Sequence, residues 1–317
     1  MKNAYMEMIG RREPVIFDGA FGTELQKAGL AESDFGGYAG CNEYLNVTRP
    51  DIVEGIHASY LEAGAHVIET NTFGGSRVKL GEFGLGERAY EINKAAAAAA
   101  RRAIEKFAGI NSDNSGDRFV CGSIGPTGFL PSSSDKELSK IQFDELVDVF
   151  TEQAKGLIDG GADVLLIETS QDLLEVRAVA IAIRRLRAAT GKYVPIQAQI
   201  TMDAGGRMLL GSDISAFLGA AHGLGVDVIG MNCSSGPDEM GPYIDKLLEL
   251  STVPVSMLPN AGLPVNVDGK AVYKMKPREF ADKVSAFVRD KGVAVAGGCC
   301  GTAPEHIKAL SEALKGV

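Results

Sequence analysis

Two adjacent cysteines stand near the end of the sequence, in the glycine-rich stretch GGCCGT at 297–302. Cys299 and Cys300 are poorly placed for a structural disulfide, because the short ring between neighbouring residues strains the geometry that the bond needs. A third cysteine, Cys233, lies in the stretch MNCSSG. Zinc favours thiolate ligands, and three protein ligands with one open position are typical of a catalytic zinc site. These cysteines therefore indicate a Zn²⁺ site that is open to a substrate.

The adjacent cysteines also have two other interpretations. Free cysteine is among the most buried residue types, so the pair could simply pack as small apolar side chains. A redox pair is the second alternative, but the C-x-x-C spacing is absent and a disulfide between neighbours is strained. The third cysteine at a separate strand end favours metal ligation. We expect Cys41 and Cys121 to be ordinary thiols.

Two carboxylates also follow apolar runs in the chain. Asp18 follows VIF, and Glu168 follows VLLI. Such a pair can do acid–base work, or it can bind a cation such as the ammonium group of an amino acid. An ion pair with an arginine or a helix cap is the structural alternative for either residue. Beside an anionic thiolate site, cation binding is the interpretation that we favour.

An eightfold alternation of strand and helix signals must position these residues. Short apolar runs, often β-branched, are followed by turns rich in Gly, Asn, Ser and Thr and then by helical stretches. Nearly continuous apolar runs are typical of a parallel sheet covered by helices, and eight such units predict a (β/α)8 TIM barrel, an α/β fold. The eight runs are 15–23, 66–75, 119–128, 164–172, 195–203, 228–236, 254–262 and 294–302.

We expect a single barrel domain at 15–317, preceded by a leader helix or tail at 1–14, because no long linker divides the chain. In a (β/α)8 barrel the chemistry lies where strands end and the following loops begin, so the three cysteines and two carboxylates are predicted to meet at one rim. The other polar residues at predicted strand ends are Glu69, Thr70, Asn71, Ser123, Thr127, Thr169, Asn232 and Asn260.

Composition excludes several other classes of protein. The chain of 317 residues carries a net charge of −9 with scattered Lys and Arg, so it has no basic surface for nucleic acid or an anionic membrane. It has no signal peptide and no run of about 20 apolar residues. We therefore expect a cytoplasmic protein with no nucleic-acid or membrane partner. The four histidines show no metal-binding spacing.

Eight motifs together give the sequence a more specific resemblance. It resembles the homocysteine S-methyltransferase family, and within it the homocysteine-binding module of cobalamin-dependent methionine synthase. The resemblance runs from about Val15 to about Lys315. The motifs are DGAFGTELQ, CNEYLNVTRPDIV, EAGAHVIETNTF, SIGPTG, GGADVLLIET, GMNCSSGPDE, PNAGLP and GGCCGTAPEHI.

The resemblance implies a zinc-dependent methyltransferase that activates homocysteine as a thiolate and methylates it to methionine. Cys233, Cys299 and Cys300 would be the metal ligands. Asn260 would occupy the fourth position until the sulfur of homocysteine takes it.

The family analogy also implies how the rest of the substrate is bound. The amino group would lie against Asp18 and Glu168, and the carboxylate near the backbone amides of Gly19 and Ala20. Glu168 would also be the candidate general base, with solvent as the alternative.

The sequence leaves three hypotheses open, two about the methyl donor and one about a non-catalytic role. The first is a methylcorrinoid protein charged by methyltetrahydrofolate, with cobalamin carried on a separate protein or on a module missing from this chain. The second is a small cationic donor, S-methylmethionine or betaine, which would need an aromatic cage; the absence of Trp favours the first. The third is a non-catalytic zinc- or thiol-binding barrel that serves as a sensor or partner subunit.

Overall fold

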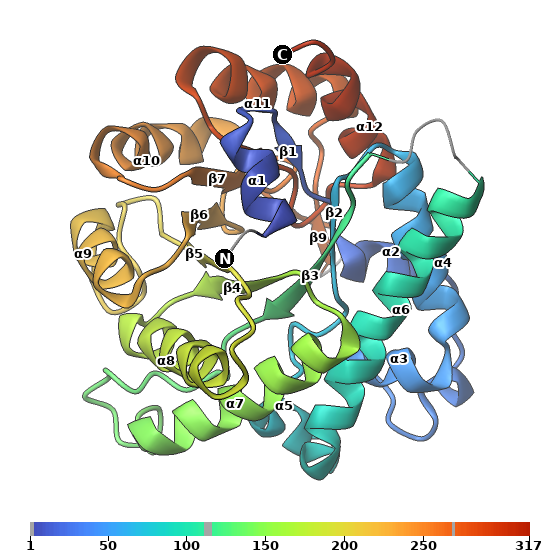
Figure 1. The fold of residues 1–317 in the computed structure, drawn as a ribbon, viewed down its shortest axis with the longest axis vertical. Helices are drawn as coiled ribbons and strands as arrows, with labels where there is room; N and C mark the ends of the chain where they lie inside the picture. Colours follow the sequence, from blue (N-terminus) through green and yellow to red (C-terminus); the bar gives the residue numbers. More distant parts are fainter. Residues whose placement is uncertain (1–2, 111–115, 268–269) are drawn as a thin grey trace.

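The computed structural model describes residues 3–110, 116–267 and 270–317. Eight parallel strands form its centre, and helices surround them (Figure 1). Each strand lies inside one of the eight apolar runs, so the predicted (β/α)8 barrel is confirmed. The strands are β1 (Val15–Ile16), β2 (Val67–Glu69), β3 (Phe119–Ile124), β4 (Val164–Ser170), β5 (Ile196–Ile200), β6 (Val228–Asn232), β7 (Val255–Leu258) and β10 (Val295–Ala296).

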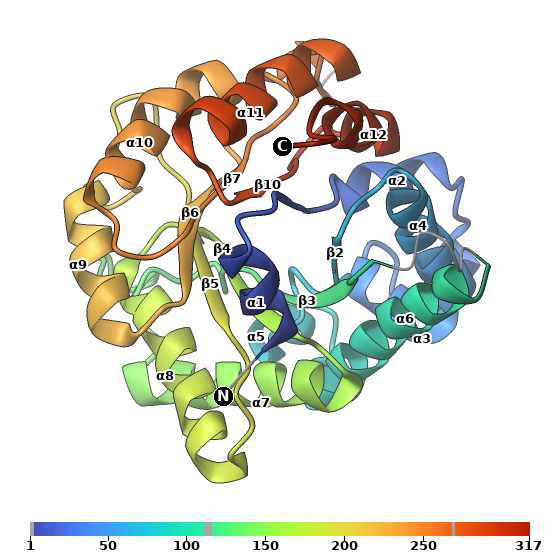
Figure 2. The same ribbon diagram turned by 45° about the horizontal axis from the view of Figure 1, so that its top comes forward.

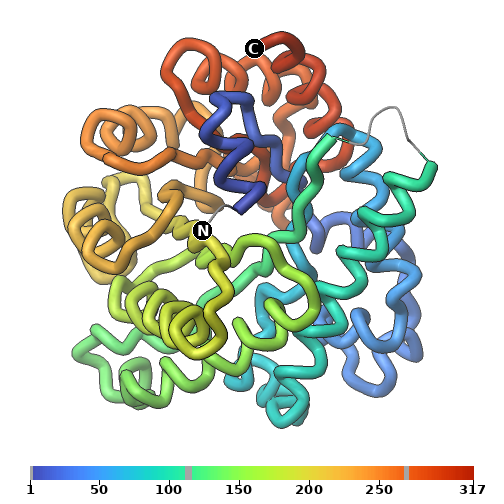
Figure 3. Tube along the Cα trace, viewed as in Figure 1, coloured from blue at the N-terminus to red at the C-terminus, as the bar shows by residue number. Residues whose placement is uncertain are grey.

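The strands close into a ring. The sheet order is β1-β10-β7-β6-β5-β4-β3-β2, with every neighbouring pair parallel. Between β1 and β2 the ring is completed by a bridge from Phe17 to Val67 and by a 2.7 Å hydrogen bond from the His66 N–H to the Ile16 carbonyl oxygen. The chain therefore travels once around the ring, and its first and last strands meet (Figure 3).

An outer layer of helices covers the strands. Asp172 and Asp213 accept backbone hydrogen bonds at the starts of two of these helices, as side-chain caps do. Left-handed glycines end four of them. The helices of this layer are α4 (Pro50–Glu62), α6 (Ala89–Ile110), α7 (Phe143–Gly160), α8 (Leu173–Thr190), α9 (Ile214–Leu224), α10 (Pro237–Leu250), α11 (Pro277–Lys291) and α12 (Pro304–Ala313).

Helix α1 (Ala4–Gly10) lies across one end of the ring, as Figures 1 and 2 show. It belongs to the segment 1–14 that was expected to be a leader helix or tail. Tyr5 is fully buried against Val15 and Val67, which lie at the starts of their strands, and its hydroxyl donates to Gln197 Oε1 at 2.6 Å. The helix thus closes the amino-terminal end of the barrel, and the opposite end carries the loops that follow the strands.

Two parts of that opposite end were not anticipated. The loop after β7 contains a two-stranded antiparallel hairpin of β8 (Val265–Val267) and β9 (Lys270–Val272). The connection from β1 to α4 contains α2 (Phe21–Lys27), α3 (Leu45–Thr48) and two 3-10 turns. Both insertions lie at the rim of the barrel that carries the predicted site. Within the described residues, no helix has the length and apolar character needed to cross a membrane.

Candidate metal and substrate site

The structure brings the three predicted cysteine ligands together at the carboxyl ends of β6 and β10. The sulfur atoms of Cys233, Cys299 and Cys300 all lie within 4.8 Å of one another, and the Cys233 and Cys300 sulfurs are 3.7 Å apart. Cys299 and Cys300 lie beyond the last residue of β10, in a turn rather than in the strand. The alternation of side chains in a strand therefore does not separate the two sulfurs.

The spacing of the sulfurs fits a tetrahedral zinc ion. Zinc–sulfur bonds of about 2.3 Å in tetrahedral geometry place the sulfurs about 3.8 Å apart, which agrees with the 3.7 Å between Cys233 and Cys300. Among the described residues, these three cysteines form the single His, Cys, Asp or Glu group that is close enough to hold a metal ion. Three soft ligands in this arrangement fit Zn²⁺ and leave a fourth position for another donor.

The backbone is strained at this site. Four non-glycine residues have a positive φ in the described part of the chain, and Cys233 (61°), Ser234 (57°) and Thr169 (53°) are three of them. Side chains disfavour this left-handed region, and such strain is kept where surrounding structure enforces it, often at functional sites. Gly301, directly after the cysteine pair, has φ of 78°, and the turn there suits a residue without a side chain.

The three thiols stabilise one negative charge among themselves. Hydrogen bonds from the Cys233 and Cys299 thiols lower the pKa of Cys300 well below that of a free thiol. The same interactions, together with burial, raise the pKa of Cys299. The cluster therefore already favours one thiolate without a metal, and thiolate is the form that binds metal ions.

The two predicted carboxylates lie at the same end of the barrel as the cysteines. Asp18 follows β1 and is 2% exposed, while Glu168 lies in β4 and is 7% exposed. Asn232 connects Glu168 to the sulfur cluster, because its amide nitrogen lies 3.1 Å from Glu168 Oε2 and 4.0 Å from the Cys299 sulfur. Ser123 donates a short hydrogen bond to the other carboxylate oxygen. Burial raises the pKa of the Glu168 carboxyl, and these hydrogen bonds oppose that rise.

Gly19, Ala20 and Asn260 are the other predicted contacts of this site, and the structure shows some of their polar groups already bonded within the chain. The Ala20 N–H donates to the Thr302 carbonyl oxygen at 2.8 Å, so this amide is engaged and not available to a substrate carboxylate. The Gly19 N–H has no partner among the described residues. A side chain on Gly19 would approach the same Thr302 oxygen to 2.6 Å, so the close approach requires glycine.

Asn260 is 2% exposed and its Oδ1 accepts the Cys300 N–H at 3.0 Å. The structure therefore shows Asn260 orienting a cysteine, and its ligation of zinc stays a prediction.

Sequence reasoning missed several contributors to this site. Glu69, Ser123 and Asn232 stood among the polar residues at predicted strand ends, but nothing in their spacing assigned them a partner. Tyr273 follows the unanticipated hairpin, and its hydroxyl helps to lower the pKa of Cys300 through a hydrogen bond. Its ring packs so closely on Gly301 that a Cβ there would come within 2.2 Å of a ring atom.

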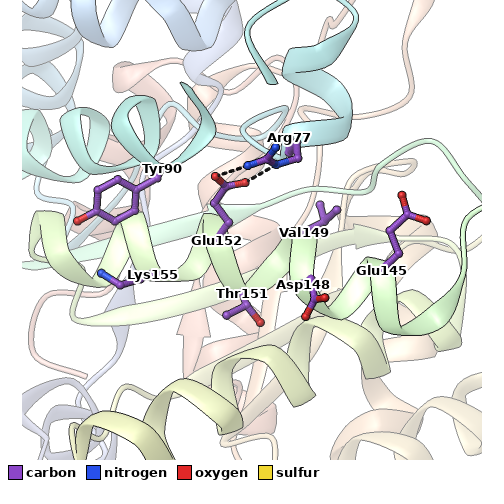
Figure 4. A pocket seen from close by; sticks show the side chains of 8 residues that line it. All are labelled: Arg77, Tyr90, Glu145, Asp148, Val149, Thr151, Glu152 and Lys155. Atoms are coloured by element: carbon purple, nitrogen blue, oxygen red, sulfur yellow. Dashed lines mark hydrogen bonds and ion pairs between the residues drawn. The ribbon is translucent and has the colours of Figure 1, made fainter. Parts of the chain in front are cut away.

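A surface hollow of about 770 Å³ lies apart from this site, between α5 (Arg77–Gly81), α6 and α7 (Figure 4). The Arg77 guanidinium bridges both carboxylate oxygens of Glu152 at 2.8 and 2.9 Å. The Lys155 ammonium lies 4.8 Å from the Tyr90 ring centroid. These charged groups already have partners in the hollow, and it contributes nothing to the cysteine site.

Comparison with known proteins decides the family. The sequence profile of the homocysteine S-methyltransferases matches residues 15–314, which is nearly the whole chain. This protein belongs to the homocysteine S-methyltransferase family. The predicted resemblance is therefore confirmed.

Relatives of this family member include much longer proteins. It is 42% identical over 303 residues to the methionine synthase of Mycobacterium tuberculosis (strain ATCC 25618 / H37Rv), covering 96% of this chain and 25% of that protein. The methionine synthase of Mycobacterium leprae (strain TN) is 41% identical over 300 residues, covering 95% and 24% respectively. The chain thus spans about a quarter of the length of these relatives.

Solved structures support the same fold. The metallated form of the homocysteine methyltransferase MmuM from Escherichia coli superposes with a TM-score of 0.77 and 22% identity, covering 96% of this chain and 98% of that one. Its apo form gives a TM-score of 0.71 at 21% identity. At 21% to 22% sequence identity, this structural similarity establishes the barrel fold and no more.

Proposed function

We propose that this protein methylates homocysteine to methionine at a zinc ion held by Cys233, Cys299 and Cys300. The observation that carries the proposal is the approach of three thiols within 4.8 Å of one another, with one pair at the 3.7 Å spacing of tetrahedral zinc ligands, beside two buried carboxylates in a member of this family. We also propose a cytoplasmic location, because five cysteines without a disulfide framework are typical of proteins in a reducing compartment.

The chain's own residues would bind and orient the substrate. Asp18 and Glu168 hold its ammonium group, and hydrogen bonds from Ser123 and Asn232 fix the Glu168 carboxylate in place. The Gly19 N–H is free to contact the substrate carboxylate. Zinc, when bound, would act as a Lewis acid that lowers the pKa of the substrate thiol, since metal-bound thiols lose their proton. Glu168 or solvent would accept that proton, and the sulfur would attack the methyl group in line while the bond between the methyl group and its donor breaks.

The surface around the site supports a macromolecular donor, and we propose a methylcorrinoid protein that carries methyl groups from methyltetrahydrofolate. Exposed apolar side chains gather on the loops after the strands, where the cysteines lie. Exposed apolar side chains at a functional rim are typical of protein contacts. This chain covers 25% of one methionine synthase relative, which leaves room for further modules in such proteins. We propose that cobalamin is carried on such a module or on a separate polypeptide. The exposed apolar side chains on the loops after the strands are Phe73, Leu138, Leu209, Leu210, Leu263, Val265, Val267 and Val272.

Replacing Leu209 with aspartate is expected to weaken transfer from a protein donor. Leu209 is 61% exposed in the loop after β5, so a charge there disrupts docking without disturbing the core. We expect the KM for a methylcorrinoid protein to rise about tenfold, equivalent to about 1.4 kcal/mol. The KM for free methylcobalamin should not change. Initial rates of methionine formation with each donor measure both constants.

Leu250→Asp is the matched control, because Leu250 is 44% exposed at the end of α10, on the opposite end of the barrel. It should leave both constants unchanged. The same assay includes S-methylmethionine and betaine. Methylation by either of these, and not by corrinoid donors, would replace the proposed donor. A zinc-loaded protein that uses none of the four donors would instead be a non-catalytic barrel.

A further inference from the structure

The strand that carries Glu168 is irregular at that residue. Between Ile167 and Ser170, β4 contains one residue more than the facing stretch of β5, and Glu168 and Thr169 lie in this interval. An extra residue of this kind forms a β-bulge, which interrupts the ladder and can re-aim a side chain. Thr169 has a φ of 53°, which a β-branched residue rarely adopts. Surrounding groups must therefore hold the backbone in this shape.

The side chain of Asn232 bonds to this bulge. Asn232 ends β6, which β5 separates from β4 in the ring, and it is buried. Its Oδ1 accepts the Thr169 N–H at 2.8 Å. Its amide nitrogen donates to the Thr169 hydroxyl at 3.0 Å and to Glu168 Oε2 at 3.1 Å. One buried amide therefore bonds both the backbone of the bulge and the carboxylate of Glu168.

The same amide lies against the cysteine cluster. Its nitrogen is 4.0 Å from the Cys299 sulfur, and Cys233 is the next residue of the chain. Asn232 thus links the candidate ammonium site to the candidate metal site. Ser123 donates to the other oxygen of Glu168, so each oxygen of this carboxylate has a donor. Hydrogen bonds of this kind favour the ionised form of a carboxyl group.

We propose that Asn232 is a positioning residue for substrate recognition. It holds the ionised Glu168 carboxylate beside the metal ligands, so that a thiol with an amino group binds in preference to one without. The inference rests on the proposed function, which brings the substrate ammonium group to Asp18 and Glu168. A carboxylate whose two oxygens are already held loses little freedom when the ammonium group arrives, and this preorganisation strengthens binding.

Calorimetric titration of the zinc-loaded protein with L-homocysteine and with 4-mercaptobutyrate tests this role. The second thiol is homocysteine without its amino group. With Asn232→Ala, we expect the dissociation constant of homocysteine to rise about tenfold, because Glu168 loses a hydrogen bond to its charged group. That of 4-mercaptobutyrate should change by less than about twofold. Metal analysis should show that the variant keeps its zinc.

A double-mutant cycle with Glu168→Gln separates positioning from a purely structural role. If Asn232 acts through the Glu168 carboxylate, Asn232→Ala should change homocysteine binding by less than about twofold once that carboxylate is absent. A full loss in the Glu168→Gln background would show independent contributions and would overturn the inference. Equal weakening of both thiols by Asn232→Ala would also overturn it, since a distorted barrel does not distinguish them.

Asn93→Ala is the matched control for the loss of a buried amide. Asn93 is fully buried, but it lies in α6 and donates to the carbonyl oxygens of Gly75 and Ala89. This variant should keep the wild-type preference for homocysteine over 4-mercaptobutyrate. A loss of that preference equal to the loss in Asn232→Ala would contradict a specific role for Asn232.

The remaining outcomes separate the inference from the proposed function. If Asn232→Ala does not fold, Asn232→Ser is judged by the same two dissociation constants. Failure of both variants to fold and to hold zinc would assign Asn232 to the fold alone and overturn the inference, while the proposed function stands. If the zinc-loaded wild type binds neither thiol, the proposed function itself fails, and the inference fails with it.

Discussion

Replacing Cys299 with serine is expected to remove zinc from the protein and to lower methyl transfer to homocysteine by at least about thirtyfold. Cys299 lies within 4.8 Å of both other sulfurs, and a serine hydroxyl is a poor ligand for a site of this softness. Without zinc, a free thiol with a pKa of about 8.5 is only about 3% thiolate at pH 7, which gives the factor. Metal analysis of the purified variant and its rate with the methyl donor measure the two effects.

Cys41→Ala is the control for the loss of a thiol. Cys41 is fully buried in a separate apolar cluster with Leu80 and Leu85, away from the three sulfurs. We expect this variant to keep about one zinc ion per chain and to retain most of its activity, although it loses some stability because of the smaller side chain. A Cys299→Ser protein that kept both zinc and full activity would exclude the ligand assignment.

Replacing Glu168 with glutamine is expected to lower kcat/KM for homocysteine by about 100-fold. The substitution removes one negative charge from a buried site that is proposed to hold an ammonium group, and breaking such a buried pair costs about 3 kcal/mol or more. The effect should depend on the substrate's amino group. With 4-mercaptobutyrate, which has the thiol and carboxylate but no ammonium, wild type and variant should therefore react at similar rates when solvent, rather than Glu168, accepts the thiol proton.

The ratio of the activities with homocysteine and with 4-mercaptobutyrate makes this prediction specific. A variant that merely distorted the barrel would lose activity on both thiols equally, and that outcome would remove Glu168 from ammonium binding. Glu175→Gln serves as the control, since Glu175 is buried in the first turn of α8 and accepts hydrogen bonds from Thr127. This control should keep the wild-type preference for homocysteine over 4-mercaptobutyrate.

The position of the site could be predicted from sequence because strand signals are local. Each apolar run marked a strand, and a barrel places every strand's carboxyl end at one rim. Cys233 and Cys299 are far apart in sequence, but both follow such runs, so their meeting follows from topology alone. The structure places Cys299 and Cys300 in a glycine-rich turn, in which the alternation of a strand does not apply.

Contacts that depend on loop paths and strand register were beyond sequence reasoning. The hairpin of β8 and β9 is a short two-stranded element, and the residues of β8 are exposed. Such hairpins are marginal alone, so they leave a weak sequence signal. The position of Tyr273 depends on that hairpin. The engagement of the Ala20 amide by Thr302 joins opposite ends of the chain and follows from how β1 and β10 align. No spacing in the sequence specifies that alignment.

X-ray absorption at the zinc edge tests the central claim most directly. The account predicts three sulfur ligands at about 2.3 Å and one lighter oxygen or nitrogen ligand in the substrate-free protein. Adding homocysteine should convert this to four sulfur ligands. Fewer than three sulfurs in the free protein, or a ligand shell that homocysteine leaves unchanged, would contradict the account.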